Sequence, residues 1–248
     1  MPITIVLDPG HGGTDSGAAA NGLLEKDVNL ALARLVATEL ALYDVEIQLT
    51  RMTDTFISLS NRADFANQLG ADFFCSLHTN AGGGTGFESY VHTSPSRGAV
   101  TARGTIHGQI ASFFRQHGFD DRGQKTANFA VLRETKMPAV LLESLFLDNP
   151  RDAATLKDIE FLKGLAKAIA TGLANAFSLP RKPVHPTPTP KPTAAPTATP
   201  TPMPHWAQAA FDYLKKQGLI TENHNLDSPV SWGELSVVLK RFWDKVIK

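Results

Sequence analysis

The sequence lacks several features that mark particular classes of protein. Basic and acidic residues balance at 24 each, so no net charge favours nucleic acid or an anionic membrane surface as a partner. No run of about 20 apolar residues occurs, so we expect no membrane span. The opening, MPITIVLD, has neither the basic start nor the apolar run of a signal peptide, so we expect synthesis in the cytoplasm without one.

Cysteine is nearly absent and proline is unevenly spread. The single Cys75 lies in the apolar run ADFFCSLH, where it predicts a small buried hydrophobic residue, with a nucleophile as the minor alternative. Ten of the 16 prolines fall within residues 180–204, mixed with threonine and alanine. This composition predicts an extended spacer of on the order of 75 Å at ~3.1 Å per residue. We therefore expect a large domain over 1–179, a linker over 180–204 and a small helical module over 205–248.

The first motif is ITIVLDPGHGGTDSG, from Ile3 to Gly17. Residues 3–7 form an apolar, β-branched run that predicts a strand buried on both faces, inside a parallel sheet. The prolines and glycines that follow break it, so His11 is expected on a tight loop at the carboxyl end of that strand, where ligands bind in open α/β sheets. A phosphate-binding loop is the weaker reading, because the stretch lacks the GxGxxG spacing and a GK[ST] ending. A histidine that is merely hydrogen-bonded in a turn is the other alternative.

Hydrophobic periodicity then alternates between the helical period and that of strands. The expected strands cover 45–50, 72–77, 86–92, 129–132 and 139–142. One expected helix begins at Glu25, and the others cover 58–69, 99–117 and 158–177. Strands that alternate with helices predict an α/β fold, in which a twisted, mostly parallel sheet carries helices on both faces.

Three candidate side chains meet at one edge of this sheet. His11, His78 and Glu143 each stand at the carboxyl end of a predicted strand, and Glu25 begins a helix above the same edge. Two histidines and one glutamate form a ligand set of hydrolytic zinc, so His11, Glu25 and His78 are candidate zinc ligands and Glu143 is the candidate base. We expect three other histidines to lie at the surface or to be hydrogen-bonded: His92, His107 and His117.

Several motifs in order resemble those of the zinc-dependent N-acetylmuramoyl-L-alanine amidases of type 3: LDPGHGGTDSGA, GLLEKDVNL, LTRMTDTFISLSNRADFAN, SLHTNA, GFES and AVLLESLFLDN. The resemblance covers nearly all of residues 2–179. It implies the same fold, the metal ligands His11, Glu25 and His78, and the catalytic glutamate Glu143. One departure is SLFLDN after Glu143, where the family more often has glycine and phenylalanine.

Other charged residues of these motifs have less specific readings. Arg51, Asp54 and Arg62 match family positions and are interpreted as structural ion pairs or hydrogen bonds. Glu88, in GFES, has two equal readings, a polar residue near the cleft or a plain strand residue.

The resemblance implies hydrolysis of the amide between the lactyl group of N-acetylmuramic acid and the first L-alanine of the peptidoglycan stem. A non-catalytic peptidoglycan-binding protein is the competing reading, but such a protein is expected to have lost a ligand or the base, and all four residues are present. The absence of a signal-like start favours a phage endolysin that acts on the cell wall after release. A host mother-cell or autolytic amidase is the alternative.

The last part, HWAQAAFDYLKKQGLI with SPVSWGEL, resembles a shortened surface-layer-homology unit, a family that binds cell-wall polymers. SWGE, residues 231–234, stands where that family has a threonine-arginine-alanine-glutamate signature, so the usual polymer-contacting arginine is missing. Two short helices bury little surface, and a unit of about 40 residues is marginal alone. We therefore expect residues 205–248 to bind a cell-wall polymer or to form a homodimer.

Overall fold

The structure is a computed structural model that describes residues 2–183 and 215–216. The chain divides into two compact units, and the first unit ends at Val184. Apart from residues 215–216, the expected module over 205–248 lies outside the described residues, as does nearly all of the expected linker. Among the described residues, no helix is long and apolar enough to cross a membrane.

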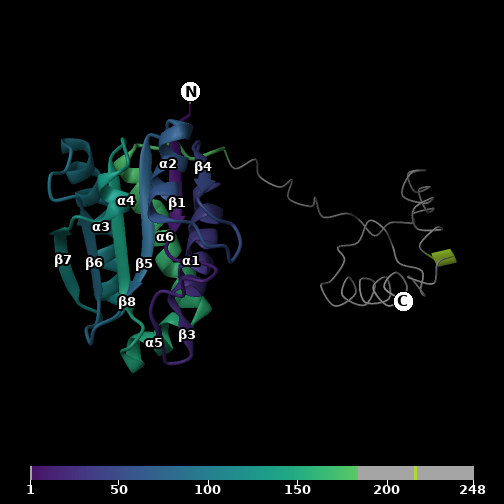
Figure 1. The fold of residues 1–248 in the computed structure, drawn as a ribbon, viewed down its shortest axis with the longest axis vertical. Coiled ribbons are helices and arrows are strands. Elements are labelled where there is room, and N and C mark those ends of the chain that lie inside the picture. The colour runs from purple at the N-terminus through teal and green to yellow at the C-terminus, as the bar shows by residue number, and fades with distance from the viewer. Residues whose placement is uncertain (1, 184–214, 217–248) are drawn as a thin grey trace, which may run out of the picture. The chain divides into compact units, whose positions relative to one another are not determined.

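A six-stranded sheet forms the centre of the first unit, in the order β4-β1-β5-β8-β6-β7 (Figure 1). Its strands are β1 (Thr4–Pro9), β4 (Glu46–Leu49), β5 (Phe73–Asn80), β6 (Phe87–Val91), β7 (Asp121–Thr126) and β8 (Ala139–Phe146). The first four neighbours in the order run parallel, β6 runs antiparallel to β8, and β7 runs parallel to β6. The predicted mostly parallel sheet is confirmed. The expected interior strand is confirmed too, because β1 lies between β4 and β5 and its apolar residues are fully buried.

Helices cover both faces of this sheet, as predicted. The helices are α1 (Glu25–Leu40), α2 (Leu59–Leu69), α3 (Arg97–Gln116), α4 (Ala130–Arg133), α5 (Pro150–Leu156) and α6 (Ile159–Ala176). On one face, Leu32, Ile106 and Ile169 from α1, α3 and α6 share a core with one side of the sheet. On the other face, α2 and α4 pack Ala66 and Val131 against the opposite side.

The ends of the helices follow local sequence signals. Ser58 caps α2, accepting a hydrogen bond from the Asn61 amide, and Gly70 ends that helix in the left-handed conformation that glycine adopts without strain. A two-residue hairpin, β2 (Ala19–Ala20) with β3 (Leu23–Leu24), leads directly into α1. The hairpin therefore fixes where α1 begins, which is at Glu25.

Three features of the strands differ from expectation. Residues 129–132 were expected to form a strand, but residues 130–133 form α4, since the Leu132 and Arg133 amides donate to the Phe129 carbonyl. Such a short apolar run suits a strand or a helical turn equally, and packing against α2 decides it. Conversely, β7 has the sequence DRGQKT, which carries no apolar alternation because it is a largely exposed edge strand. The strands that carry His78 and Glu143 also continue past them, to Asn80 and Phe146.

Candidate metal and catalytic site

The loop after β1 brings His11 against His78. His11 has a left-handed backbone, with φ of 60°, and its neighbour Gly10 donates its amide to the Leu77 carbonyl of β5. A Cβ atom at Gly10 would lie 2.1 Å from the His78 ring, so only glycine permits this approach. The two imidazole rings lie edge to face, with centroids 5.0 Å apart.

Two buried arginines hold this loop in place. Arg62 donates to Asp8 Oδ1 at 2.8 Å and to the His11 carbonyl at 2.7 Å. Arg51 donates to the carbonyls of Pro9 and Gly10 at 3.0 and 2.9 Å. These contacts agree with the structural interpretation of both arginines, and they show what the arginines stabilise, which is the backbone that carries His11.

Asp54 has a related role in the same loop. Its Oδ1 accepts from the Gly13 amide at 2.7 Å, and its Oδ2 pairs with Lys26 at 2.7 Å. Asp54 therefore links the loop to the first turn of α1, as the structural interpretation anticipates.

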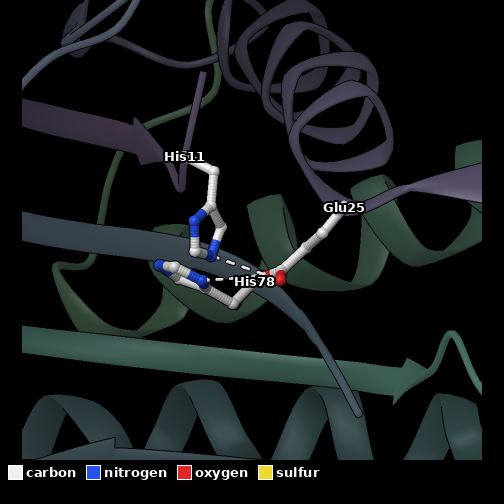
Figure 2. Close-up of side chains that lie close together, drawn as sticks. All are labelled: His11, Glu25 and His78. Carbon is white, nitrogen blue, oxygen red and sulfur yellow. Dashed lines mark hydrogen bonds and ion pairs between the residues drawn. The ribbon is translucent and has the colours of Figure 1, made fainter. Parts of the chain in front are cut away.

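The carboxylate of Glu25 lies between the two histidines (Figure 2). Its Oε2 is 3.2 Å from His11 Nε2, and its Oε1 is 2.9 Å from His78 Nδ1. One ligand atom from each of the three side chains lies within 4.8 Å of the others. The structure thus brings together the three candidate metal ligands that the sequence singles out, from the loop after β1, the start of α1 and β5.

A fourth residue, Asp15, positions His11. Asp15 Oδ2 lies 2.8 Å from His11 Nδ1, so the carboxylate accepts that N–H and leaves Nε2 facing Glu25. An outer carboxylate of this kind fixes the tautomer and raises the basicity of a metal-binding histidine. The sequence gives a single weak signal for this role, which is an aspartate four residues after His11 in a glycine-rich loop.

The charged forms of these side chains stabilise one another: the Glu25 carboxylate favours protonated histidines, and the histidines favour the ionised carboxylate. The hydrogen bond to Glu25 is the main cause that raises the pKa of His11 to about 9, against the opposing effect of burial. Burial opposes the ionisation of Glu25, but hydrogen bonds from His11 and His78 outweigh it and hold the pKa of Glu25 far below its usual value. Burial likewise opposes the protonation of His78, but Glu25 and Glu143 outweigh it and raise its pKa. Two basic nitrogens around one carboxylate are a donor set that suits a divalent cation such as zinc.

Glu143 lies next to this cluster in the sheet. It is the register partner of His78 in the β5–β8 pair, and its Oε2 is buried without a hydrogen-bond partner among the described residues. Burial raises the pKa of Glu143 to about 7. A partly buried side chain whose inner carboxyl oxygen has a free acceptor and whose pKa is near neutrality has the properties of a general base.

His11, His78 and Glu143 line one cavity of about 410 Å³. Exposed apolar side chains, Phe56 and Leu59, form part of its wall. A larger cavity of about 550 Å³ lies beside α3, α5 and α6, but none of the candidate site residues lines it. The smaller cavity is therefore the candidate active site.

Other reactive side chains of the described chain are placed for structural roles. Ser89, His107 and Asp121 form a hydrogen-bonded series with distances of 2.8 and 2.9 Å, but the serine has no exposed surface and cannot reach a substrate. Cys75 is fully buried, which raises its thiol pKa and confirms the reading as a small hydrophobic residue. His107 is hydrogen-bonded, as anticipated, and buried rather than at the surface.

Comparisons with known proteins identify the family of this chain. Residues 5–175 match the family described as N-acetylmuramoyl-L-alanine amidase. The chain is 46% identical over 181 residues to N-acetylmuramoyl-L-alanine amidase CwlM of Bacillus licheniformis, covering 71% of this chain and 70% of that protein. It is 45% identical over 186 residues to the endolysin of Bacillus phage SPP1, covering 73% of this chain and 69% of that protein.

Solved structures give the same result. The catalytic domain of CwlV, an N-acetylmuramoyl-L-alanine amidase from Bacillus (Paenibacillus) polymyxa var. colistinus, superposes with a TM-score of 0.67 at 37% identity, covering 71% of this chain and 99% of that one. An N-acetylmuramoyl-L-alanine amidase from Clostridium difficile 630 gives a TM-score of 0.68 at 34% identity, covering 71% and 97%. The chain belongs to the N-acetylmuramoyl-L-alanine amidase family.

Proposed function

We propose that this chain hydrolyses the amide between the lactyl group of N-acetylmuramic acid and the L-alanine of the peptidoglycan stem, using zinc held by His11, Glu25 and His78. The observation that carries the proposal is the convergence of these three side chains beside Glu143, whose Oε2 has no hydrogen-bond partner among the described residues. The family match and the relatives, which are themselves named as amidases and an endolysin, support the same reaction.

The donor set suits zinc because catalytic zinc takes three protein ligands from histidine and carboxylate side chains. When bound, zinc supplies a Lewis acid that polarises the scissile carbonyl and makes a water molecule acidic near neutral pH. Asp15 contributes by holding His11 in one tautomer, and Arg51 and Arg62 contribute by fixing the backbone on which His11 stands.

Glu143 moves the proton. It accepts a proton from the attacking water, whose oxygen forms the new bond to the carbonyl carbon, and then delivers it to the amide nitrogen as the carbon–nitrogen bond breaks. A pKa near 7 suits both halves of this transfer, since neither protonation state is strongly favoured. The products are a lactyl carboxylate and a peptide with a free L-alanine amino group.

Product analysis on purified cell walls tests this proposal. We expect the zinc-loaded protein to release N-terminal L-alanine without generating new reducing sugar ends, since no glycosidic bond is cleaved. A folded, zinc-loaded protein that binds the walls and releases no L-alanine amino groups would contradict the proposal and favour the non-catalytic reading.

The biological setting is a separate part of the proposal. We expect a phage endolysin, and the alternative is a mother-cell or autolytic amidase of the host. The phage endolysin and a sporulation-specific amidase of Bacillus subtilis are 45% and 46% identical to this chain, so identity alone does not favour one. A neighbouring gene for a holin would support the endolysin, and a neighbouring sporulation gene would support the alternative.

A further inference from the structure

Charged side chains cross four neighbouring strands beside the candidate base. His78 on β5 is the register partner of Glu143 on β8, and Glu143 is in turn the partner of Glu88 on β6. The next strand, β7, supplies Arg122 and Lys125, which both bond to Glu88. Because neighbouring strands lie about 4.8 Å apart, the two cations on β7 are on the order of 10 Å from Glu143, measured across the sheet.

Glu88 fixes these two cations in place. Its side chain is buried, and its Oε1 accepts from Asn80 at 2.9 Å and from the Tyr90 hydroxyl at 2.7 Å. Its Oε2 accepts from Arg122 Nε at 2.7 Å and from Lys125. Burial opposes the ionisation of Glu88, but these hydrogen bonds, that of Lys125 first, outweigh it and lower its pKa to about 2. Glu88 thus carries one negative charge and Arg122 and Lys125 carry two positive charges, so the three side chains together have a net positive charge.

The excess charge faces solvent rather than a second protein anion. Arg122 uses only its Nε in a hydrogen bond, and within residues 2–183 no partner hydrogen-bonds its two terminal nitrogens. Its guanidinium lies over the Phe146 ring at 4.7 Å, which restricts its movement. The side chains of Arg122 and Lys125 are 34% and 37% exposed. A guanidinium held in this way presents two parallel N–H groups, the arrangement that binds a carboxylate.

The two ends of the candidate active site differ in chemistry. One wall of the cavity carries the exposed, apolar Phe56 and Leu59, which offer a surface to an uncharged ring. Toward β7, Tyr90 packs against Phe129 of the cavity wall, with ring centroids 5.3 Å apart, and the Glu88 cluster follows. A substrate that extends from the metal site past Glu143 toward β7 therefore meets the cations.

We propose that Arg122 and Lys125 bind a free carboxylate on the peptide side of the scissile amide, one residue beyond the L-alanine. This inference rests on the proposed function. Two extended residues span at most about 7 Å, and the long side chains of arginine and lysine cover the remaining distance. Glu88 is the positioning residue that aligns both cations, which gives a role to the residue for which the sequence leaves two readings open.

The test compares two N-acetylmuramoyl dipeptides that differ only in the main-chain carboxyl group of the second residue, either free carboxylate or primary carboxamide. We expect the wild-type protein to prefer the carboxylate by about tenfold or more in kcat/KM, mainly through KM, as for one hydrogen bond to a charged group. Arg122→Gln and, separately, Lys125→Gln should each reduce this preference. The control is Lys163→Gln, which replaces an exposed lysine of α6 that pairs with Glu160. This variant should keep the wild-type preference.

Each result decides between the readings. A loss of activity by the same factor on both substrates is what a merely structural ion pair would cause, and it would overturn the inference. Equal cleavage of both substrates by the wild-type protein would also overturn it while leaving the proposed function intact. If the wild-type protein cleaves neither dipeptide nor cell walls, the proposed function fails and the carboxylate site fails with it.

Discussion

At the scale of single residues, hydrogen bonding separates two carboxyl groups of the candidate site, that of the proposed ligand Glu25 and that of the proposed base Glu143. Glu25 is buried but receives hydrogen bonds from two histidines, so it stays ionised. Glu143 is partly buried, and its Oε2 is buried without a partner within the described part of the chain, so its pKa rises toward neutrality. These environments suit the two glutamates to the different roles proposed for them.

Glu143→Gln tests the role of the base. The amide has nearly the same shape as the carboxyl group but accepts no proton, so we expect turnover to fall by about 10²- to 10⁴-fold. Metal content and the thermal unfolding temperature should stay close to those of the wild-type protein, since Glu143 is not among the candidate ligands. Near-normal turnover in this variant would show that another group accepts the proton.

The pKa of His11 predicts proton release on metal binding. In the metal-free protein His11 has a pKa of about 9, so it is protonated at pH 7, and the pKa of His78 is raised as well. A metal must displace these protons, so metal affinity should increase with pH up to about 9. Conversely, the stability that His11 gives the metal-free fold is fully present below about pH 6.5 and is lost as the pH rises through 9.

Calorimetric titration with zinc in buffers of different protonation enthalpy measures this release. We expect the apparent binding enthalpy at pH 7 to change with the buffer, corresponding to about one or two protons per ion. An enthalpy that is the same in all buffers would mean that the histidines are already neutral.

At the scale of elements, the sequence predicts the site better than it predicts the sheet edge. His11, His78 and Glu143 could be placed because each follows a short apolar run that is typical of a strand buried on both faces, in a chain where such runs alternate with helical periodicity. The strand β7 could not be found, because an exposed edge strand buries no face and shows no apolar alternation. Arg122 and Lys125 were missed with it, since their place beside Glu88 depends on the pairing of β7 with β6. Asp15 was missed because its contact with His11 depends on the shape of the loop.

Arg62 supports the loop between β1 and α1, so its loss should lower the free energy of unfolding by a large amount. Replacing it by methionine would leave Asp8 as an uncompensated buried charge, because the two side chains pair at 2.8 Å and are both almost fully buried. Removing one partner of such a pair costs about 3–5 kcal/mol. Arg115→Met, which removes an exposed pair with Asp121, is the control and should cost at most about 1 kcal/mol.

Denaturant unfolding of both metal-free variants provides the comparison. We expect Arg62→Met to unfold at a much lower denaturant concentration than the wild-type protein and to bind zinc more weakly, because the His11 loop loses a support. Equal midpoints for the two variants would show that Arg62 does not stabilise the loop.

At the scale of the whole molecule, the sheet domain is completed by residues just after the expected boundary at 179. The Lys182 amide donates to the Leu42 carbonyl, and the Asp44 amide donates to the Pro180 carbonyl. Arg181 forms an isolated bridge with Tyr43 and lies over its ring at 5.8 Å. The first residues of the expected linker are thus bonded to the segment between α1 and β4. The linker and the module over 205–248 stay predictions.

Two truncations test where the catalytic domain ends. A chain that stops after residue 183 should stay folded, bind zinc and hydrolyse soluble substrate at the full-length rate. A chain that stops after residue 179 loses two backbone hydrogen bonds, so its free energy of unfolding should fall by about 1–3 kcal/mol. Equal stability of the two truncations would place the boundary at 179.

The truncation at 183 also tests the module over 205–248. We expect the full-length chain to sediment with whole cell walls and the truncated chain to sediment much less, while light scattering gives the mass of each. A full-length dimer that sediments no better than the truncated monomer would assign the module to dimerisation alone.

The most direct test of the account is a zinc titration of the metal-free protein that follows amide cleavage. Activity should be absent without metal, rise linearly with added zinc and reach its plateau at one ion per chain, with N-terminal L-alanine as the new end. His78→Ala should show neither tight zinc binding nor activity, since it removes one of the three ligand atoms that converge at the site. Full activity of the metal-free protein, or of His78→Ala without bound zinc, would contradict the proposed site.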